Sequence, residues 1–203
     1  FCQSLPSECR VSEHPGQHGP DDATHGAHPE GVERGTVAEG SFHPGRAEEA
    51  HDARNRAEAP VQQVVLQGEE ANLMHLPVLT QHELEPGPYL TAAHATTCDP
   101  DSGVDNTAIQ RCWVQGPRRM TYFPYPTTHN ARNLRKYWAR GEPCPVAFWI
   151  GHHPAVLLGT QAKLGYPQSH WRAAGGVLGE PLRLVPSVLH GERIMVPADA
   201  EIV

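Results

Sequence analysis

The feature that most constrains the fold of this chain is a sharp change of composition near residue 60. Within the 203-residue sequence, residues 1–60 contain few large apolar side chains, and these follow neither a helical nor a strand period. Gly, Pro, His, Glu and Ala fill the space between them. Such a segment buries too little apolar surface to offset its chain entropy. The sequence therefore predicts a disordered segment over 1–60 and a folded domain over 61–203.

Histidines are frequent in the predicted disordered segment, but they share no recurring ligand spacing. They are His14, His18, His25, His28, His43 and His51. A metal-binding tract is therefore the less favoured interpretation. A reading frame shifted through GC-rich DNA would produce a similar mixture of Arg, Ala, Gly, Pro and His, and this origin stays open.

Charge, hydropathy and cysteine usage exclude several classes of protein. A net charge of -7 argues against nucleic acid as a partner. No apolar run approaches the roughly 20 residues of a membrane helix, and the N-terminus has no signal-peptide pattern. The five cysteines are odd in number and include no C-x-x-C pair, which indicates a reducing compartment. We therefore expect a cytoplasmic protein without a membrane partner.

Residues 61–203 have the pattern of a folded domain. "VQQVVLQG" (61–68) predicts a strand, and residues 89–126 predict three strands separated by the turn sequences "DPDSG" and "GPRR". Further elements are predicted as helices over 129–140, 154–160 and 169–179, and as strands over 145–151, 181–188 and 193–197. This order predicts an α+β domain with a mostly antiparallel core.

Several ordered blocks of the domain resemble one known family. "GPYLTAAHATTCDPDSGVDNTAIQRCWVQGPRR", "HNARNLRKYWARGEPCPVAFWIGHHPAVLLGT", "GGVLGEPLRLV" and "VPADAEIV" are similar to the central part of UbiD-type decarboxylases. These enzymes act on aromatic and α,β-unsaturated acids and use prenylated FMN. The resemblance runs from about Val61 to Val203. It implies a flavin-binding split β-barrel, in agreement with the predicted meander.

The resemblance also implies a site. The family's N-x4-R pattern matches Asn106, as a metal ligand, and Arg111, as a catalytic residue beside the flavin. A histidine that opens the next helix matches His129, the second metal ligand. The metal would be Mn²⁺ with a nearby K⁺, bridging the protein to the flavin phosphate. Further contacts with the flavin are expected from Thr107, Ile109, Thr160 and Gln161.

Two features of this implied site are irregular. Where the family has a glutamate as third metal ligand, an ungapped count reaches His170, which removes a negative charge and favours imidazole-binding ions such as Zn²⁺ or Fe²⁺. Asn106 and Arg111 are five residues apart, so strict alternation would place them on opposite faces of one strand. They share a site only if the strand bends or bulges between them. His152 and His153 match no ligand and are interpreted as a turn.

The implied function is decarboxylation, by a chain that ends before the family's catalytic glutamates and C-terminal α/β domain. Glu180 and Glu201 match no catalytic position and are expected in solvent, so a fragment of this kind would lack the general acid and be inactive alone. A flavin-binding partner subunit of a split carboxylase, or a decayed barrel without activity, are the alternatives. The resemblance further implies a homo-oligomer or a partner subunit, and a flavin prenyltransferase as supplier of the cofactor.

Overall fold

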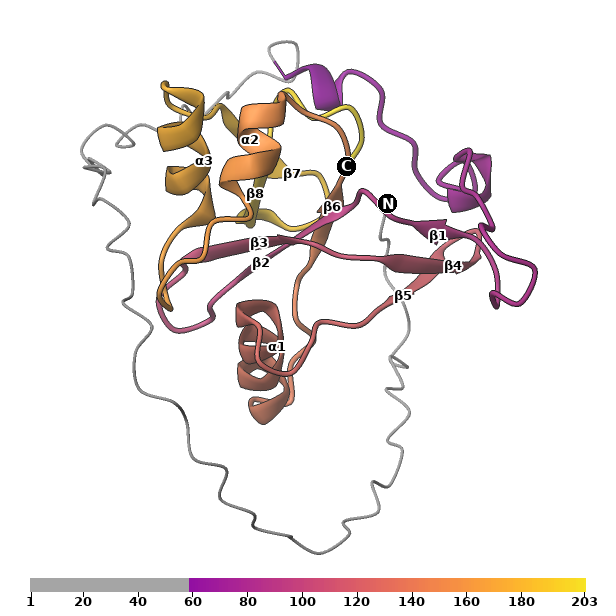
Figure 1. Ribbon diagram of the computed structural model, residues 1–203, viewed down its shortest axis with the longest axis horizontal. Coiled ribbons are helices and arrows are strands. Elements are labelled where there is room, and N and C mark those ends of the chain that lie inside the picture. The colour runs from indigo at the N-terminus through magenta and orange to yellow at the C-terminus, as the bar shows by residue number, and fades with distance from the viewer. Residues whose placement is uncertain (1–58) are drawn as a thin grey trace, which may run out of the picture. The chain divides into compact units, whose positions relative to one another are not determined.

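The computed structural model describes residues 59–203 (Figure 1). The predicted disorder of residues 1–58 and the six histidines there lie outside the described residues. Ala59, which is fully buried, and Pro60 belong to the folded unit. None of the helices described for this unit is both long and apolar enough to cross a membrane.

Three antiparallel sheets and three α-helices form the described unit (Figure 1). The first sheet has the order β1-β4-β5, with β1 at Tyr89–Leu90, β4 at Cys112–Gly116 and β5 at Arg119–Tyr122. The second has the order β3-β2-β6, with β3 at Asp105–Ile109, β2 at His94–Cys98 and β6 at Ala147–Trp149. The third pairs β7, Leu184–Ser187, with β8, Gly191–Pro197. Helix α1 spans His129–Ala139, helix α2 spans Pro154–Gly159 and helix α3 spans His170–Leu178. Two short 3-10 helices lie at Pro60–Gln62 and Leu73–His75.

The helices begin and end where local signals place them. The Thr128 side chain accepts a hydrogen bond from the Ala131 N–H at the start of α1, and the Ser169 side chain accepts one from the Arg172 N–H at the start of α3. Gly179 ends α3 in the left-handed conformation, with φ at 88°. The predicted helices over 129–140, 154–160 and 169–179 are therefore confirmed to within a residue or two.

The predicted meander is present, but its strands are interrupted. The chain leaves the first sheet after β1, passes through the β2–β3 hairpin of the second sheet, and returns to the first sheet at β4. The crossing from β3 to β4 lies at Gln110 and Arg111, where the Gln110 N–H donates to the Ala93 carbonyl oxygen at 2.8 Å. The strand does bend between Asn106 and Arg111, so strict alternation does not apply to this pair.

The strand predicted over 61–68 does not form. Pro60 opens a 3-10 helix instead, and the Val61 N–H donates to the Ala198 carbonyl oxygen at 3.1 Å. The Gln62 side chain donates to the Pro186 carbonyl oxygen at 2.6 Å. Val61 packs against the core. Val61 is half-buried while Val64 and Leu66 are exposed, so the run contacts the core through a turn and a few side chains rather than through sheet pairing.

The core lies between the second sheet, the α2–α3 pair and the β7–β8 hairpin. Trp149 of β6 packs there with Val156 of α2, Trp171 of α3 and Leu184 of β7. A mixed fold with antiparallel sheets and few helices is thus confirmed. The expected split barrel is not confirmed as a closed barrel. Residues 59–203 form three separate sheets, and β1, β3 and β5 each pair with only one neighbour.

Candidate functional site

A buried polar network attaches α1 to the β2–β3 hairpin. The side-chain oxygen of Asn130, which is fully buried, accepts hydrogen bonds from Thr97 Oγ1 at 2.7 Å and from Asn106 Nδ2 at 2.6 Å. Its Nδ2 donates to the Ala95 carbonyl oxygen at 3.3 Å. Because Asn106 uses its nitrogen toward Asn130, its side-chain oxygen is the atom it can offer to a ligand.

The network continues through the next turn of α1 to the loop before α3. Asn133 donates from Nδ2 to Thr97 Oγ1 at 2.9 Å and accepts from the Tyr166 hydroxyl at 2.9 Å. The Tyr166 ring meets the His129 ring edge to face, with centroids 5.1 Å apart. The start of α1 and the loop before α3 are therefore held together beside β3.

The start of α3 is fixed to the same strand by a carboxylate. Asp105 accepts hydrogen bonds from the backbone N–H groups of His170 at 2.8 Å and Trp171 at 3.1 Å, and from the Ser169 hydroxyl. Burial raises the pKa of Asp105, and these hydrogen bonds oppose the rise. A negative charge at a helix N-terminus also interacts favourably with the helix dipole. Asp105 thus determines where His170 lies.

His129 and His170 each open a helix, and the structure brings their rings within 6.3 Å, centroid to centroid. His170 is 5% exposed, and its Nδ1 has no hydrogen-bond partner among the described residues. Burial, and to a lesser extent the charge of His129, lowers the pKa of His170 to about 4. Burial and the nearby Arg132 also lower the pKa of His129. Both imidazoles are therefore neutral near pH 7, the form that binds metal ions.

The candidate donors are the side-chain oxygen of Asn106, whose amide nitrogen bonds the residue after His129, and the imidazoles of His129 and His170. Within residues 59–203 no three His, Cys, Asp or Glu side chains group together as a metal site. An imidazole nitrogen lies about 2 Å from a bound metal ion, so a centroid separation of 6.3 Å is close to that of two rings on either side of one ion. Two neutral imidazoles at this separation are the kind of donors that a divalent ion accepting nitrogen ligands would use. The metal roles of Asn106, His129 and His170 remain predictions.

Three of the expected flavin contacts meet at the end of β3. The Ile109 N–H donates to Gln161 Oε1 at 3.2 Å, and Gln161 Nε2 donates to Thr160 Oγ1 at 3.0 Å. Successive N–H groups along a strand point to opposite edges. The Gln110 N–H points to β2, so the N–H groups of Ile109 and Thr107 point to the other, free edge of β3. The Thr107 side chain is fully buried and its hydroxyl bonds Thr96 Oγ1 at 2.8 Å. Thr107 can therefore reach a ligand at this edge only through its main chain.

The contacts of Arg111 are with β1 and not with the two histidines. Its side chain is exposed, with the guanidinium carbon 4.9 Å from the centre of the Tyr89 ring of β1. Among the described residues no hydrogen bond or ion pair joins Arg111 to Asn106, His129 or His170. Its catalytic role stays a prediction.

His152 and His153 lie in a hydrogen-bonded turn. The His153 ring accepts a hydrogen bond from the Ala155 N–H at the start of α2, and the His152 ring accepts one from the His153 N–H. These two histidines form the predicted turn between β6 and α2. Glu180 and Glu201 are both exposed.

Sequence reasoning missed the residues that hold the candidate ligands in place: Asp105, Asn130, Asn133 and Tyr166. One signal was available. Asn130 and Asn133 lie three residues apart on a helix, so they share a face, and two polar residues on the face that packs against a sheet indicate a buried network. The partners of these side chains come from distant strands, which no local pattern identifies.

Comparison with protein families gives one match over most of the chain. The family described as "UbiD: 3-octaprenyl-4-hydroxybenzoate carboxy-lyase Rift-related domain" matches residues 53–203. A phenolic acid decarboxylase of Streptomyces sp. (strain D7) is 30% identical over 154 residues, which cover 73% of this chain and 32% of the relative. A phenolic acid decarboxylase of Bacillus subtilis (strain 168) is 34% identical over 140 residues, covering 66% and 29%. The chain therefore spans about a third of the length of these relatives.

Solved structures of related enzymes share this fold. A UbiD-class enzyme of Pelotomaculum thermopropionicum, HmfF, in an evolved dimeric form with prFMN, superposes with a TM-score of 0.66 at 37% identity, covering 72% of this chain and 34% of the enzyme. The vanillic acid decarboxylase of Sedimentibacter hydroxybenzoicus in its closed form gives a TM-score of 0.67 at 28% identity, covering 72% and 32%.

Proposed function

Because this chain belongs to the UbiD family of carboxy-lyases, we propose that it forms the flavin-holding part of a decarboxylase that acts on an aromatic or α,β-unsaturated carboxylic acid. The proposed cofactor is prenylated FMN, which one of the similar structures contains. When bound, this flavin supplies the electron sink for loss of CO₂.

The observation that supports the proposal is the approach of the His129 and His170 rings to 6.3 Å, at helix starts that are hydrogen-bonded to β3. Asn130 orients the amide of Asn106, and Asp105 and Tyr166 fix the helix starts that carry the two histidines. In α3, the N–H groups of His170 and Trp171 are bonded to Asp105. The N-terminus of α1 is therefore the one better suited to an anionic phosphate, because helix N-termini bind anions through their N–H groups.

A divalent ion held by Asn106 Oδ1, His129 and His170 would neutralise part of the phosphate charge. This donor set lacks the carboxylate that Mn²⁺ prefers, and imidazole suits Zn²⁺ or Fe²⁺. We therefore expect these ions to bind more tightly than Mn²⁺. A K⁺ ion next to the same phosphate completes the proposed arrangement.

The flavin ring would lie along the edge of β3. The Thr107 main-chain N–H points to this edge, and Ile109, Gln161 and Thr160 already form one hydrogen-bonded chain at its end. Arg111 lies two residues after the end of β3. Its exposed side chain packs over the Tyr89 ring. A rotation of that side chain toward the edge would let its guanidinium bind a substrate carboxylate through two hydrogen bonds.

The proposed function is that of a part rather than of a complete enzyme. The family resemblance implies a general acid outside the residues that it matches here, so the isolated chain would bind flavin weakly and release no CO₂. As a second candidate, the chain acts as the flavin-binding subunit of a split carboxylase or as a subunit of a homo-oligomer. A similar enzyme has been solved in a dimeric form. A flavin prenyltransferase would supply the cofactor.

Titration of FMN into the purified chain, followed by flavin fluorescence, tests the proposal. Zn²⁺ or Fe²⁺ should tighten FMN binding, and His129→Ala should weaken it about tenfold or more, because the metal bridge is lost. The matched control is His82→Ala, which replaces an exposed histidine far along the chain from β3. FMN affinity that is indifferent both to the ions and to His129→Ala would favour the decayed barrel.

A further inference from the structure

One face of α1 lies along the Tyr166 ring. The residues of this face are His129, Arg132, Asn133 and Lys136, spaced three or four residues apart. The Tyr166 hydroxyl donates to Asn133 Oδ1 at 2.9 Å, which fixes the position of the ring. The guanidinium carbon of Arg132 lies 4.4 Å from the ring centre, and the His129 ring meets the same ring edge to face. Tyr166 therefore holds the Arg132 side chain on the same side of α1 as His129.

The two cations on this face of α1 differ in their partners. Lys136 Nζ lies 2.6 Å from Asp99 Oδ1 and 2.8 Å from Asp101 Oδ2, so two carboxylates compensate its charge. Arg132 is exposed, and within residues 59–203 it forms no ion pair with a carboxylate. A guanidinium that is stacked on an aromatic ring and has no carboxylate partner can bind an anionic ligand.

A buried nitrogen at the same place also points to a ligand. The ring of His170, which is 5% exposed, lies 6.3 Å from the His129 ring, and its Nδ1 has no hydrogen-bond partner in the described part of the chain. A buried polar atom of this kind costs free energy unless a ligand or a water satisfies it. Asp105 accepts from the His170 and Trp171 N–H groups, so this carboxylate is engaged with α3 rather than with Arg132.

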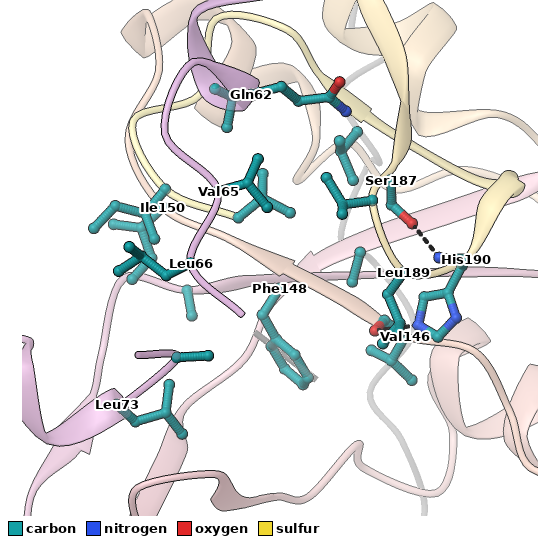
Figure 2. Close-up of a pocket in the computed structure, with 18 of the residues that line it drawn as sticks. Gln62, Val65, Leu66, Leu73, Val146, Phe148, Ile150, Ser187, Leu189 and His190 are labelled. Carbon is teal, nitrogen blue, oxygen red and sulfur yellow. Dashed lines mark hydrogen bonds between the residues drawn. The ribbon is translucent and has the colours of Figure 1, made fainter. Parts of the chain in front are cut away.

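An apolar cavity of about 200 Å³ elsewhere in the unit offers no comparable charge (Figure 2). Val65, Leu66 and Phe148 are among its lining residues, which all lie between 61 and 203 and include no Lys or Arg. His190 is the one titratable side chain among them, and burial lowers its pKa. A phosphate would lose its hydration in this cavity without gaining a cation. The anionic end of a flavin is therefore better accommodated beside Arg132.

We propose that Arg132 binds the 5′-phosphate of the flavin and makes the site selective for FMN over riboflavin, which lacks this phosphate. The inference rests on the proposed function, because it assigns one more residue to the flavin held beside β3. Residues three apart on a helix, such as His129 and Arg132, have Cβ atoms about 5–6 Å apart. An ion on His129 and the guanidinium of Arg132 can therefore contact one phosphate, to which the guanidinium presents two parallel N–H donors.

Titration of FMN and of riboflavin into the full 203-residue chain with Zn²⁺, followed by flavin fluorescence, tests the inference. The two flavins have the same ring system, so the ratio of their dissociation constants measures the contribution of the phosphate. Arg132→Ala should weaken FMN binding about tenfold to a hundredfold, as expected for hydrogen bonds between charged groups, and leave riboflavin binding unchanged. Arg132→Lys keeps the charge but not the paired donors, and should restore part of the affinity for FMN.

Arg135→Ala is the matched control. It removes the same charge from another exposed position of α1, where the Arg135 side chain bonds the Pro126 carbonyl oxygen. This variant should bind both flavins as the unmodified chain does. Because Arg132 and Arg135 are both exposed, both alanine variants should keep the thermal unfolding transition.

Two results would overturn the inference alone. Equal losses for FMN and riboflavin in Arg132→Ala would mean that Arg132 acts on the flavin ring or on the fold. Unchanged FMN binding in Arg132→Ala, together with weaker binding in His129→Ala, would place the phosphate out of reach of Arg132 and still support the proposed function. An unmodified chain that binds neither flavin would overturn the proposed function, and this inference with it.

Discussion

The side-chain amide of Asn106 donates to the side-chain oxygen of Asn130 at 2.6 Å, and this hydrogen bond joins β3 to α1 at the candidate metal site. The same oxygen of Asn130 accepts from Thr97. One buried amide therefore both supports the fold and orients a candidate ligand. Substitutions in this network should affect stability and metal response together.

Asn130→Ala should lower the free energy of unfolding by about 3 kcal/mol, because it leaves the buried donors of Asn106 and Thr97 without an acceptor. Chemical denaturation measures this loss. Arg135→Ala, an exposed position on the same helix, is the control and should stay within about 0.5 kcal/mol. An equal loss in both variants would mean that the network contributes no more than helix propensity.

Gly159→Ala should separate α2 from α3. A Cβ at this position would lie 2.5 Å from Ala174 Cα, and backbone atoms cannot move aside easily. The expected cost is about 1–3 kcal/mol, as for other insertions into packed contacts. Gly116→Ala meets nothing within 4 Å and should leave the melting temperature unchanged. Equal melting temperatures for the two variants would show that the helices are not in tight contact.

His94 should make the domain sensitive to acid. Its ring stacks on Trp149 with centroids 4.2 Å apart. Burial, opposed only in part by the Ala92 backbone, lowers the pKa of His94 from its usual 6.5 to about 4. The unfolded chain takes up the proton first as pH falls, so stability is full above pH 6.5 and is lost between pH 6.5 and about 4. The loss approaches about 3 kcal/mol.

His94→Phe keeps a ring on Trp149 and removes the titrating group. Denaturation midpoints measured from pH 7.5 to 4.5 should fall less steeply in this variant than in the unchanged chain. Because His170 is also buried with a lowered pKa, part of the slope should remain. Identical slopes would place the acid sensitivity elsewhere.

His170→Glu should change which ion stabilises the domain. The carboxylate adds an oxygen ligand and a negative charge, both of which favour Mn²⁺ over ions that prefer imidazole. The thermal shift with Mn²⁺ should therefore increase relative to that with Zn²⁺. His170→Gln, which is uncharged, is the matched control and should not gain a response to Mn²⁺. A preference for Zn²⁺ that is unaltered by His170→Glu would exclude residue 170 as a ligand.

Helices were predictable from the sequence because their determinants are local. Thr128, Ser169 and Gly179 cap or end helices through neighbours within a few residues. The apolar run at 61–68 had no such local determinant. Its contacts are with Pro186 and Ala198, far along the chain, and they outweighed the strand propensity of its valines.

For the candidate site, the family resemblance identified residues that the structure brings together in part. The rings of His129 and His170 lie 6.3 Å apart, and Asn106 bonds the residue after His129. Arg111 contacts Tyr89 instead. Periodicity alone could not reveal this division, because the break after Ile109 moves Arg111 out of the strand that carries Asn106.

That same break makes each of the two hairpins, β2–β3 and β4–β5, a unit with mainly local contacts. Local contacts form quickly, and the entropy of closing a loop rises with its length. During synthesis on a ribosome, both hairpins could fold while the residues near Ile202 are still in the exit tunnel. The bridge from Ile150 to Ile202 would then form only after both hairpins.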